Sequence, residues 1–401
     1  MKFFIALRRR WYRWFLGGRG LSSGAFRIRD VARNWLVYSL TGSALALGWV
    51  DAAWGVATFL LSLFGGAASD RVGRRRLLVL GQIGVALIPL VVTFLIFGGV
   101  IQVWHLVVAN FIMGVVFAFV VPARHALLGD LMSPEVLLNA MALSTIVTSV
   151  AQIASSAMGG KLVDEAGPVP AYLLVAGCMA LTAWMFSKLP STKEEGDEQE
   201  SEDSIRDDLA EGANYILDKP LLVGILALEL GQVLFYRPHS ILLPFFAGDV
   251  FEVGATGLGL LQGASSVGGL LGSLIIASLG DFRYKGWLLI GAGILSGVGL
   301  LFLGWAPTFF LALISLALAT MGGSAYTVTR ITLLQSISSK QMRGRVVGFR
   351  RLIWGMRPLG VLPVGALADA VGAPLTVTLT GGVILLLFVV GSLLQPGLRR
   401  H

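Results

Sequence analysis

The sequence contains little charge for its length. Asp, Glu, Lys and Arg together make up only 13% of the 401 residues, whereas hydrophobic residues make up 55%. Soluble domains carry about 25% charged residues, so this composition excludes an ordinary soluble protein. It predicts a protein that crosses a lipid bilayer many times.

Cysteine and histidine are also scarce. The single cysteine, Cys178, lies in an apolar segment, so the chain cannot form an intramolecular disulfide or a cysteine-based metal site. The four histidines are scattered, and the sequence contains neither a His-Glu-x-x-His motif nor a nucleotide-binding loop. We therefore expect no metal, no cofactor and no enzymatic activity.

Long apolar segments dominate what remains. A helix needs about 20 apolar residues to cross a bilayer, and twelve segments meet this requirement. They are residues 14–40, 45–68, 77–97, 103–124, 138–160, 169–189, 221–246, 256–279, 287–304, 308–331, 346–370 and 375–394. The sequence thus predicts an all-α membrane protein with twelve transmembrane helices.

Lys and Arg are distributed unevenly among the connections. They gather after the even-numbered segments, as in residues 71–76, and at both ends of the chain, in residues 8–13 and 399–400. Because cytoplasmic loops carry the excess of Lys and Arg, we predict that both termini are cytoplasmic. The net charge of +8 is then directed at anionic lipid headgroups and not at nucleic acid.

An acidic stretch over residues 191–208 interrupts the hydrophobic pattern and is typical of a solvated linker. We predict an N-terminal six-helix half over residues 1–190 and a C-terminal half over residues 219–401. Between them, residues 191–218 form a cytoplasmic linker and a short interfacial helix.

The two predicted halves contain an internal repeat. Gly160-Lys-Leu-Val-Asp164-Glu-Ala-Gly167 matches Gly365-Ala-Leu-Ala-Asp369-Ala-Val-Gly372 at an offset of 205 residues, and the surroundings of Arg124 match those of Arg330. Such repeats indicate two pseudo-symmetric halves with a substrate path between them.

The connection after the second apolar segment reads Gly66-x-x-x-Asp70-Arg71-x-Gly73-Arg74-Arg75. It resembles the signature loop between helices 2 and 3 of the major facilitator superfamily of secondary transporters. The resemblance implies the fold of that superfamily and a cytoplasmic gate that ties the two halves together. The expected gate residues are Gly66, Asp70, Arg71, Gly73 and Arg74, with a weaker counterpart at Asp281 and Arg283.

Four further segments look like the enterobactin exporter and macrolide efflux branch of that superfamily: residues 34–43, 122–131, 334–335 and 343–346. Members of this branch are proton-driven exporters, so the resemblance implies efflux across the bacterial inner membrane. The chain departs from the branch at Ser155-Ser156, where Gly-Pro is frequent, and at Ala25-Phe26, where Gly-Asp is common.

Ionisable residues inside a membrane are costly and therefore candidates for function. Asp51, Glu229 and Asp30, in this order, are our candidates for proton coupling, because Asp51 has no Lys or Arg nearby on its own helix. The alternative for Asp51 is a structural hydrogen bond to a neighbouring helix. The alternative for Asp30 is a static ion pair with Arg27 or Arg33.

Arginines and aromatic residues are the candidates for substrate contact. Arg27, Arg237 and Arg357 would favour an anionic or zwitterionic substrate if they converge on one cavity. Their alternative role is to pair with the membrane carboxylates and leave no net charge. Aromatic side chains expected to line an apolar pocket are Trp54, Phe235 and Trp354.

Together these features favour a monomeric, proton-coupled exporter of amphipathic small molecules, such as drugs or siderophore-like metabolites, working by alternating access. Two alternatives remain. A lysophospholipid or other lipid transporter would have the same fold, and a transport-inactive receptor would signal without moving a substrate.

Overall fold

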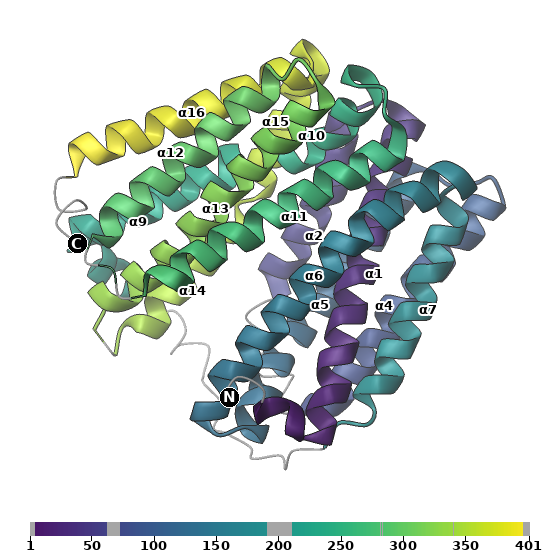
Figure 1. Ribbon diagram of the computed structural model, residues 1–401, viewed down its shortest axis with the longest axis horizontal. Helices are drawn as coiled ribbons and strands as arrows, with labels where there is room; N and C mark the ends of the chain where they lie inside the picture. Colours follow the sequence, from purple (N-terminus) through teal and green to yellow (C-terminus); the bar gives the residue numbers. More distant parts are fainter. Residues whose placement is uncertain are drawn as a thin grey trace. The chain divides into compact units, whose positions relative to one another are not determined.

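The computed structural model describes residues 5–61, 73–190, 211–280, 282, 284–339 and 341–395, and within these ranges it contains helices and no strand (Figure 1). The all-α prediction is confirmed. Most of the predicted acidic linker and the loop over residues 62–72 lie outside the described residues.

The chain forms two compact units. The first comprises Met1–Gly42, Ala53–Gln199 and Val253–Gly263, and the second comprises Ser43–Ala52, Glu200–Glu252 and Ala264–His401. Each unit thus includes a short segment from the other predicted half. The first unit holds α1 (Arg10–Thr41), the second half of α2 (Ala44–Leu61), α4 (Arg74–Phe97), α5 (Val103–Leu131), α6 (Pro134–Ala166) and α7 (Pro168–Phe186).

The second unit holds the start of α2 and most of the helices from residue 220 onward. These are α9 (Pro220–Gly231), α10 (His239–Phe245), the larger part of α11 (Gly254–Leu279), α12 (Lys285–Gly304), α13 (Phe309–Ile337), α14 (Arg343–Gly355), α15 (Pro358–Val371) and α16 (Ala373–Leu394). The π-helical turn Gln232–Tyr236 joins α9 to α10, and a second π-helical turn, Phe246–Val250, follows α10.

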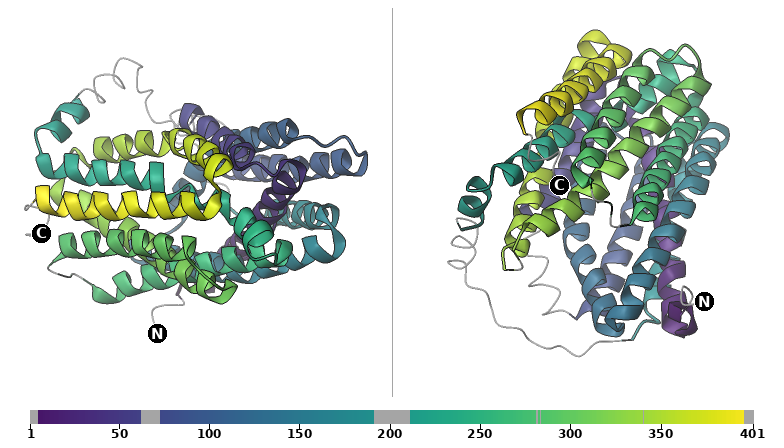
Figure 2. Two further views of the ribbon diagram at one scale, coloured as in Figure 1. Left: turned by 90° about the horizontal axis from the view of Figure 1, so that it is seen from above. Right: turned by 60° about the vertical axis from the view of Figure 1, so that its left-hand side comes forward.

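Packing within the two units follows the same scheme (Figure 2). In the first unit α4 lies against α5 and α7, and in the second α12 lies against α13 and α16. Because α4 and α12 occupy corresponding places in the two predicted halves, the shared packing agrees with the internal repeat.

Ten of the helical segments in the described residues are long and apolar enough to span a membrane. The expected first span is present as α1 but is too polar for that criterion, since it carries several arginines. The expected eleventh span is divided between α14 and α15, so neither piece is long enough by itself.

The seventh span is also irregular, and proline explains why. An α-helix would require residue 238 to donate a hydrogen bond to the carbonyl of Leu234, but Pro238 has no N–H. The chain instead widens into the π-helical turn, and the N–H of Arg237 donates to the carbonyl of Gln232 at 3.0 Å. Such turns are frequent at functional sites.

The repeated segment at the end of α15 caps another helix of the second unit. Asp369 accepts hydrogen bonds from the backbone N–H of Ala44 at 2.6 Å and of Leu45 at 3.2 Å, and from the hydroxyl of Ser43 at 2.6 Å. The carboxylate therefore satisfies amides that the first turn of α2 leaves without intrahelical partners.

The matching segment at the end of α6 does the same in the first unit. Asp164 accepts hydrogen bonds from the N–H groups of Ala255 and Thr256, each at 2.7 Å, at the start of α11. Both repeats end in a glycine with positive φ, Gly167 at 78° and Gly372 at 85°, a conformation that other residues rarely adopt. The repeat in the sequence is thus a repeat of one capping structure.

Candidate functional site

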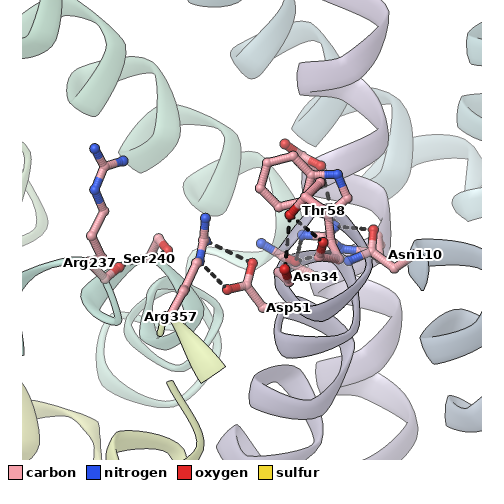
Figure 3. A network of polar contacts seen from close by, with 11 residues as sticks. Asn34, Asp51, Thr58, Asn110, Arg237, Ser240 and Arg357 are labelled. Atoms are coloured by element: carbon pink, nitrogen blue, oxygen red, sulfur yellow. Dashed lines mark hydrogen bonds and ion pairs between the residues drawn. The ribbon is translucent and has the colours of Figure 1, made fainter. Parts of the chain in front are cut away.

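Asp51 and Arg357 form an ion pair in the second unit (Figure 3). Arg357 donates from Nε to Oδ2 of Asp51 at 2.7 Å and from Nη2 to Oδ1 at 2.8 Å. The side chain of Asp51 is only 12% exposed, and that of Arg357 is 16% exposed. Two parallel charge-assisted hydrogen bonds of this kind hold both groups in one orientation.

The break between α14 and α15 positions this arginine. Pro358 begins α15, and Met356 and Arg357 lie between the two helices. The partner that Asp51 lacks on its own helix therefore comes from 306 residues away. Of the two roles considered for Arg357, the observed geometry is the pairing with a carboxylate.

Glu229 and Arg330 form a second, more deeply buried pair. Nη1 of Arg330, on α13, lies 2.9 Å from Oε1 of Glu229, on α9, and the side chains are 3% and 0% exposed. The indole Nε1 of Trp354 donates to the same carboxylate oxygen at 3.1 Å. Removing two charges from water is costly, so this pair is held by the fold around it.

The hydrogen bonding of the second pair is incomplete. Oε2 of Glu229 and both Nε and Nη2 of Arg330 are buried and have no hydrogen-bond partner within the described part of the chain. A partly satisfied buried network is less stable than a complete one. Such atoms are candidates for binding a proton or a ligand group.

Arg237 lies over the ring of Trp354, with its guanidinium carbon 4.4 Å from the ring centroid. Arg237 and Arg350 are close enough to Glu229 to interact with it electrostatically. Arg357 is likewise close enough to interact with Arg237. Among the described residues Arg237 makes no salt bridge, and its guanidinium group contacts the π system of Trp354 instead. Phe235, on the π-helical turn, is half-buried.

The cluster in the second unit, defined as Asp51, Glu229, Arg237, Arg330, Arg350 and Arg357, contains four cations and two carboxylates. Positive charge therefore exceeds negative charge by two. Arg27, Arg237 and Arg357 were expected to contact substrate. The structure brings Arg237 and Arg357 into this cluster (Figure 3).

Asp30 belongs to the first unit and has two partners there. It lies 2.6 Å from Nη2 of Arg29 and 3.6 Å from Nη1 of Arg33. The expected i, i+3 pair with Arg33 is present, and the adjacent Arg29 makes the shorter contact. Arg27 donates instead to the side chain of Gln152 at 3.3 Å. The static ion pair considered for Asp30 is therefore the geometry observed.

Of the aromatic candidates, Trp54 belongs to the first unit, whereas Phe235 and Trp354 belong to the second. Its carbonyl accepts a hydrogen bond from Thr58 at 2.9 Å, and its backbone closely approaches α5 at Gly114. In this unit Trp54 contributes to the packing of α2 on α5.

Of the expected gate residues, Gly73 and Arg74 are described. Gly73 has a φ of 83°, which turns the chain into α4, and Arg74 forms an ion pair with Asp130 at the end of α5. The other five lie outside the described residues: Gly66, Asp70, Arg71, Asp281 and Arg283.

Sequence reasoning missed Arg330 and Arg350 of the cluster in the second unit, and it missed Asn110 in the first unit. Arg330 entered only as a match in the internal repeat, although its charge inside the tenth predicted span was the signal that could have found it. Asn110, which accepts a hydrogen bond from Arg33 at 2.9 Å, is neutral and carried no such signal.

The chain matches a known protein family. The profile of the Major Facilitator Superfamily matches residues 21–355 and 228–400. The chain belongs to the major facilitator superfamily. The predicted resemblance is confirmed, and the protein is a membrane transporter and not an enzyme.

This superfamily member is similar to several efflux proteins. It is 29% identical to the multidrug efflux pump Tap of Mycolicibacterium fortuitum, with 94% of each chain covered. It is 23% identical to macrolide efflux protein A of Streptococcus pyogenes, with 93% of each covered. It is 25% identical to the enterobactin exporter EntS of Shigella boydii, covering 85% of this chain and 80% of the relative.

Solved structures support the same fold. The nucleoside transporter NupG matches with a TM-score of 0.73 and 12% identity, covering 96% of this chain and 99% of NupG. The human organic anion transporter MFSD10 matches with a TM-score of 0.61 and 19% identity, covering 96% and 99%. At these identities the likeness concerns the fold alone.

Proposed function

We propose that this transporter exports amphipathic small molecules in exchange for protons, by alternating access, from the cytoplasm across the bacterial inner membrane. The similarity to multidrug, macrolide and enterobactin efflux proteins supports export. The buried charges of the second unit support proton coupling.

One observation carries the coupling proposal: Oε2 of Glu229 is a buried acceptor with no hydrogen-bond partner among the residues that the structure describes. A proton can occupy this oxygen, or a donor group of the substrate can bind to it, but not both at once. Mutually exclusive binding of proton and substrate at one carboxylate is what an antiporter requires. We therefore place Glu229 ahead of Asp51, because both oxygens of Asp51 accept hydrogen bonds from Arg357. Glu229 also precedes Asp30, whose carboxylate is 30% exposed and pairs with Arg29 and Arg33.

The charge of the cluster suggests the chemistry of the substrate. Arg237 and Arg330 are cations that a negatively charged group could approach, and Trp354 and Phe235 offer apolar surface beside them. A zwitterionic amphipath would place its anionic group on the arginines and its donor group on Glu229. Since both donor and proton need the same oxygen, such a substrate is suited to antiport.

The test is transport in liposomes carrying a pH gradient, with a macrolide and enterobactin as probes. We expect Glu229→Gln to lose substrate-driven proton movement, because glutamine cannot exchange a proton. The same variant should retain exchange of labelled substrate across the membrane without a gradient.

Glu165→Gln is the matched control. Glu165 is 67% exposed and lies near Lys161 at the end of α6, so its substitution should leave both measurements unchanged. The proposal is wrong if Glu229→Gln moves protons with substrate as the wild type does.

A further inference from the structure

An apolar groove of about 630 Å³ runs between α4 and α7 in the first unit. Its walls include Val79, Ile83 and Leu90 on α4 and Leu173, Ala180 and Trp184 on α7. Several of these side chains are strongly exposed, with Ile83 at 43%, Leu173 at 48% and Trp184 at 49%. In a membrane-spanning helix pair, such a surface faces hydrocarbon.

The groove has the length of one lipid leaflet. From Val79 to Leu90 the helix advances eleven residues, or about 16 Å at about 1.5 Å per residue. The hydrocarbon core is about 30 Å thick, so one leaflet contributes about half of that. A single acyl chain can therefore lie along the whole groove.

One end of the groove is cationic. Ser187 lies at that end, and its carbonyl accepts a hydrogen bond from Nη2 of Arg75 at 2.5 Å. Nζ of Lys188 lies 5.3 Å from the ring centroid of Trp184, which lines the groove. Lys188 and Arg76 are exposed at the surface. The opposite end, near Leu90 and Leu173, is apolar.

We infer that this groove is a binding site for one anionic phospholipid, with an acyl chain between α4 and α7 and the phosphate group beside Arg75 and Lys188. A basic pocket between helices at the membrane surface is suited to an anionic headgroup. A zwitterionic lipid would fill the groove but gain less from the two cations.

Gly177 allows the groove to be filled without disturbing the helices. Apart from the local backbone of α7, no described heavy atom lies within 4 Å of the place where a Cβ would stand, and the residue lines the groove. We expect Gly177→Leu to occupy the space of the acyl chain. Gly291, on α12 of the second unit, is equally open, so Gly291→Leu is the matched control.

The measurement is native mass spectrometry of the full-length protein in mild detergent, with phosphatidylglycerol or phosphatidylcholine added in equal amounts. The wild type and Gly291→Leu should retain one phosphatidylglycerol in preference to phosphatidylcholine. Gly177→Leu should lose most of this retained lipid.

A second variant tests the headgroup and does not depend on the packing of the helices. Lys188→Gln should reduce the preference for phosphatidylglycerol several-fold and leave phosphatidylcholine binding unchanged. Lys161→Gln, at an exposed site on α6, should have no effect. Equal retention of the two lipids by the wild type, or unchanged retention in Gly177→Leu, would overturn the inference.

Discussion

At the scale of single residues, the second unit is organised by charges that are buried in pairs. Asp51 with Arg357 and Glu229 with Arg330 are each held at hydrogen-bond distance in surroundings that water hardly reaches. Losing one partner of such a pair is far more costly than losing both, because the remaining charge stays buried and unpaired. The two pairs differ in their oxygens: both oxygens of Asp51 accept hydrogen bonds, whereas one oxygen of Glu229 has no partner in the described ranges of the chain.

The first prediction concerns the complete pair. Arg357→Gln leaves the carboxylate of Asp51 buried without its cation, so we expect it to lower the free energy of unfolding by about 3–5 kcal/mol. Thermal unfolding in detergent would show this as a lower midpoint temperature.

The double variant Asp51→Asn/Arg357→Gln is the control. It removes both charges together and should recover most of the lost stability. If the double variant is as unstable as Arg357→Gln, the ion pair is not what Arg357 contributes.

At the scale of elements, matched carboxylates join the end of one helix to the start of another. Asp369 binds the first amides of α2, and Asp164 binds the first amides of α11. Each cap connects helices that are distant in sequence but lie in the same compact unit. The cap hydrogen bonds are 2.6–2.7 Å long. If the transporter alternates between conformations and a carboxylate moves away from the helix start that it caps, these bonds must break.

The second prediction follows from this pairing. Asp369→Ala removes a charged acceptor from a helix N-terminus, which costs about 0.5–2 kcal/mol. If the caps act together in one conformational change, this variant should also raise maleimide labelling of Ala255→Cys at the other cap. Ala255 is fully buried, and Cys178 is the only native cysteine, so Cys178→Ala gives a clean background.

Glu165→Ala is the matched control, because Glu165 is next to Asp164 but is 67% exposed and lies near Lys161 at the surface. It should leave the labelling of Ala255→Cys unchanged. Labelling that rises at Ala44→Cys but not at Ala255→Cys would mean that Asp369 stabilises only its own helix.

At the scale of the whole molecule, we expect the orientation of the protein in the membrane to follow from the Lys and Arg residues outside the spans. The excess of Lys and Arg lies in the connections after even-numbered spans and at the chain ends. Because translocating such segments is unfavourable, we expect them to stay in the cytoplasm.

The third prediction is therefore that both termini are cytoplasmic. A reporter that folds only in the cytoplasm should be active when fused at residue 1 or at residue 401, and alkaline phosphatase should be inactive at both ends. Activity of alkaline phosphatase at either end would contradict the predicted orientation. A fusion in the connection between α4 and α5 should give the opposite pattern and serves as the internal control.

The sequence by itself determined the fold class, the family and the positions of the helices. These follow from the period and length of apolar segments and from local motifs, which need no knowledge of distant residues. It also located the charged residues inside the membrane and the repeat whose two copies form matching caps. The irregular seventh and eleventh spans could be anticipated from Pro238 and Pro358, because a missing N–H acts within one turn.

Only the tertiary structure decided which charges meet. Asp51 and Arg357 are 306 residues apart, and no spacing rule connects them. An arginine partner for Asp30 could be predicted from the sequence of its own helix, because the partners lie within one turn. Whether a membrane carboxylate is paired or retains an unbound oxygen depends on helices brought together by packing. That is why Glu229, and not Asp51, became the first candidate for proton coupling.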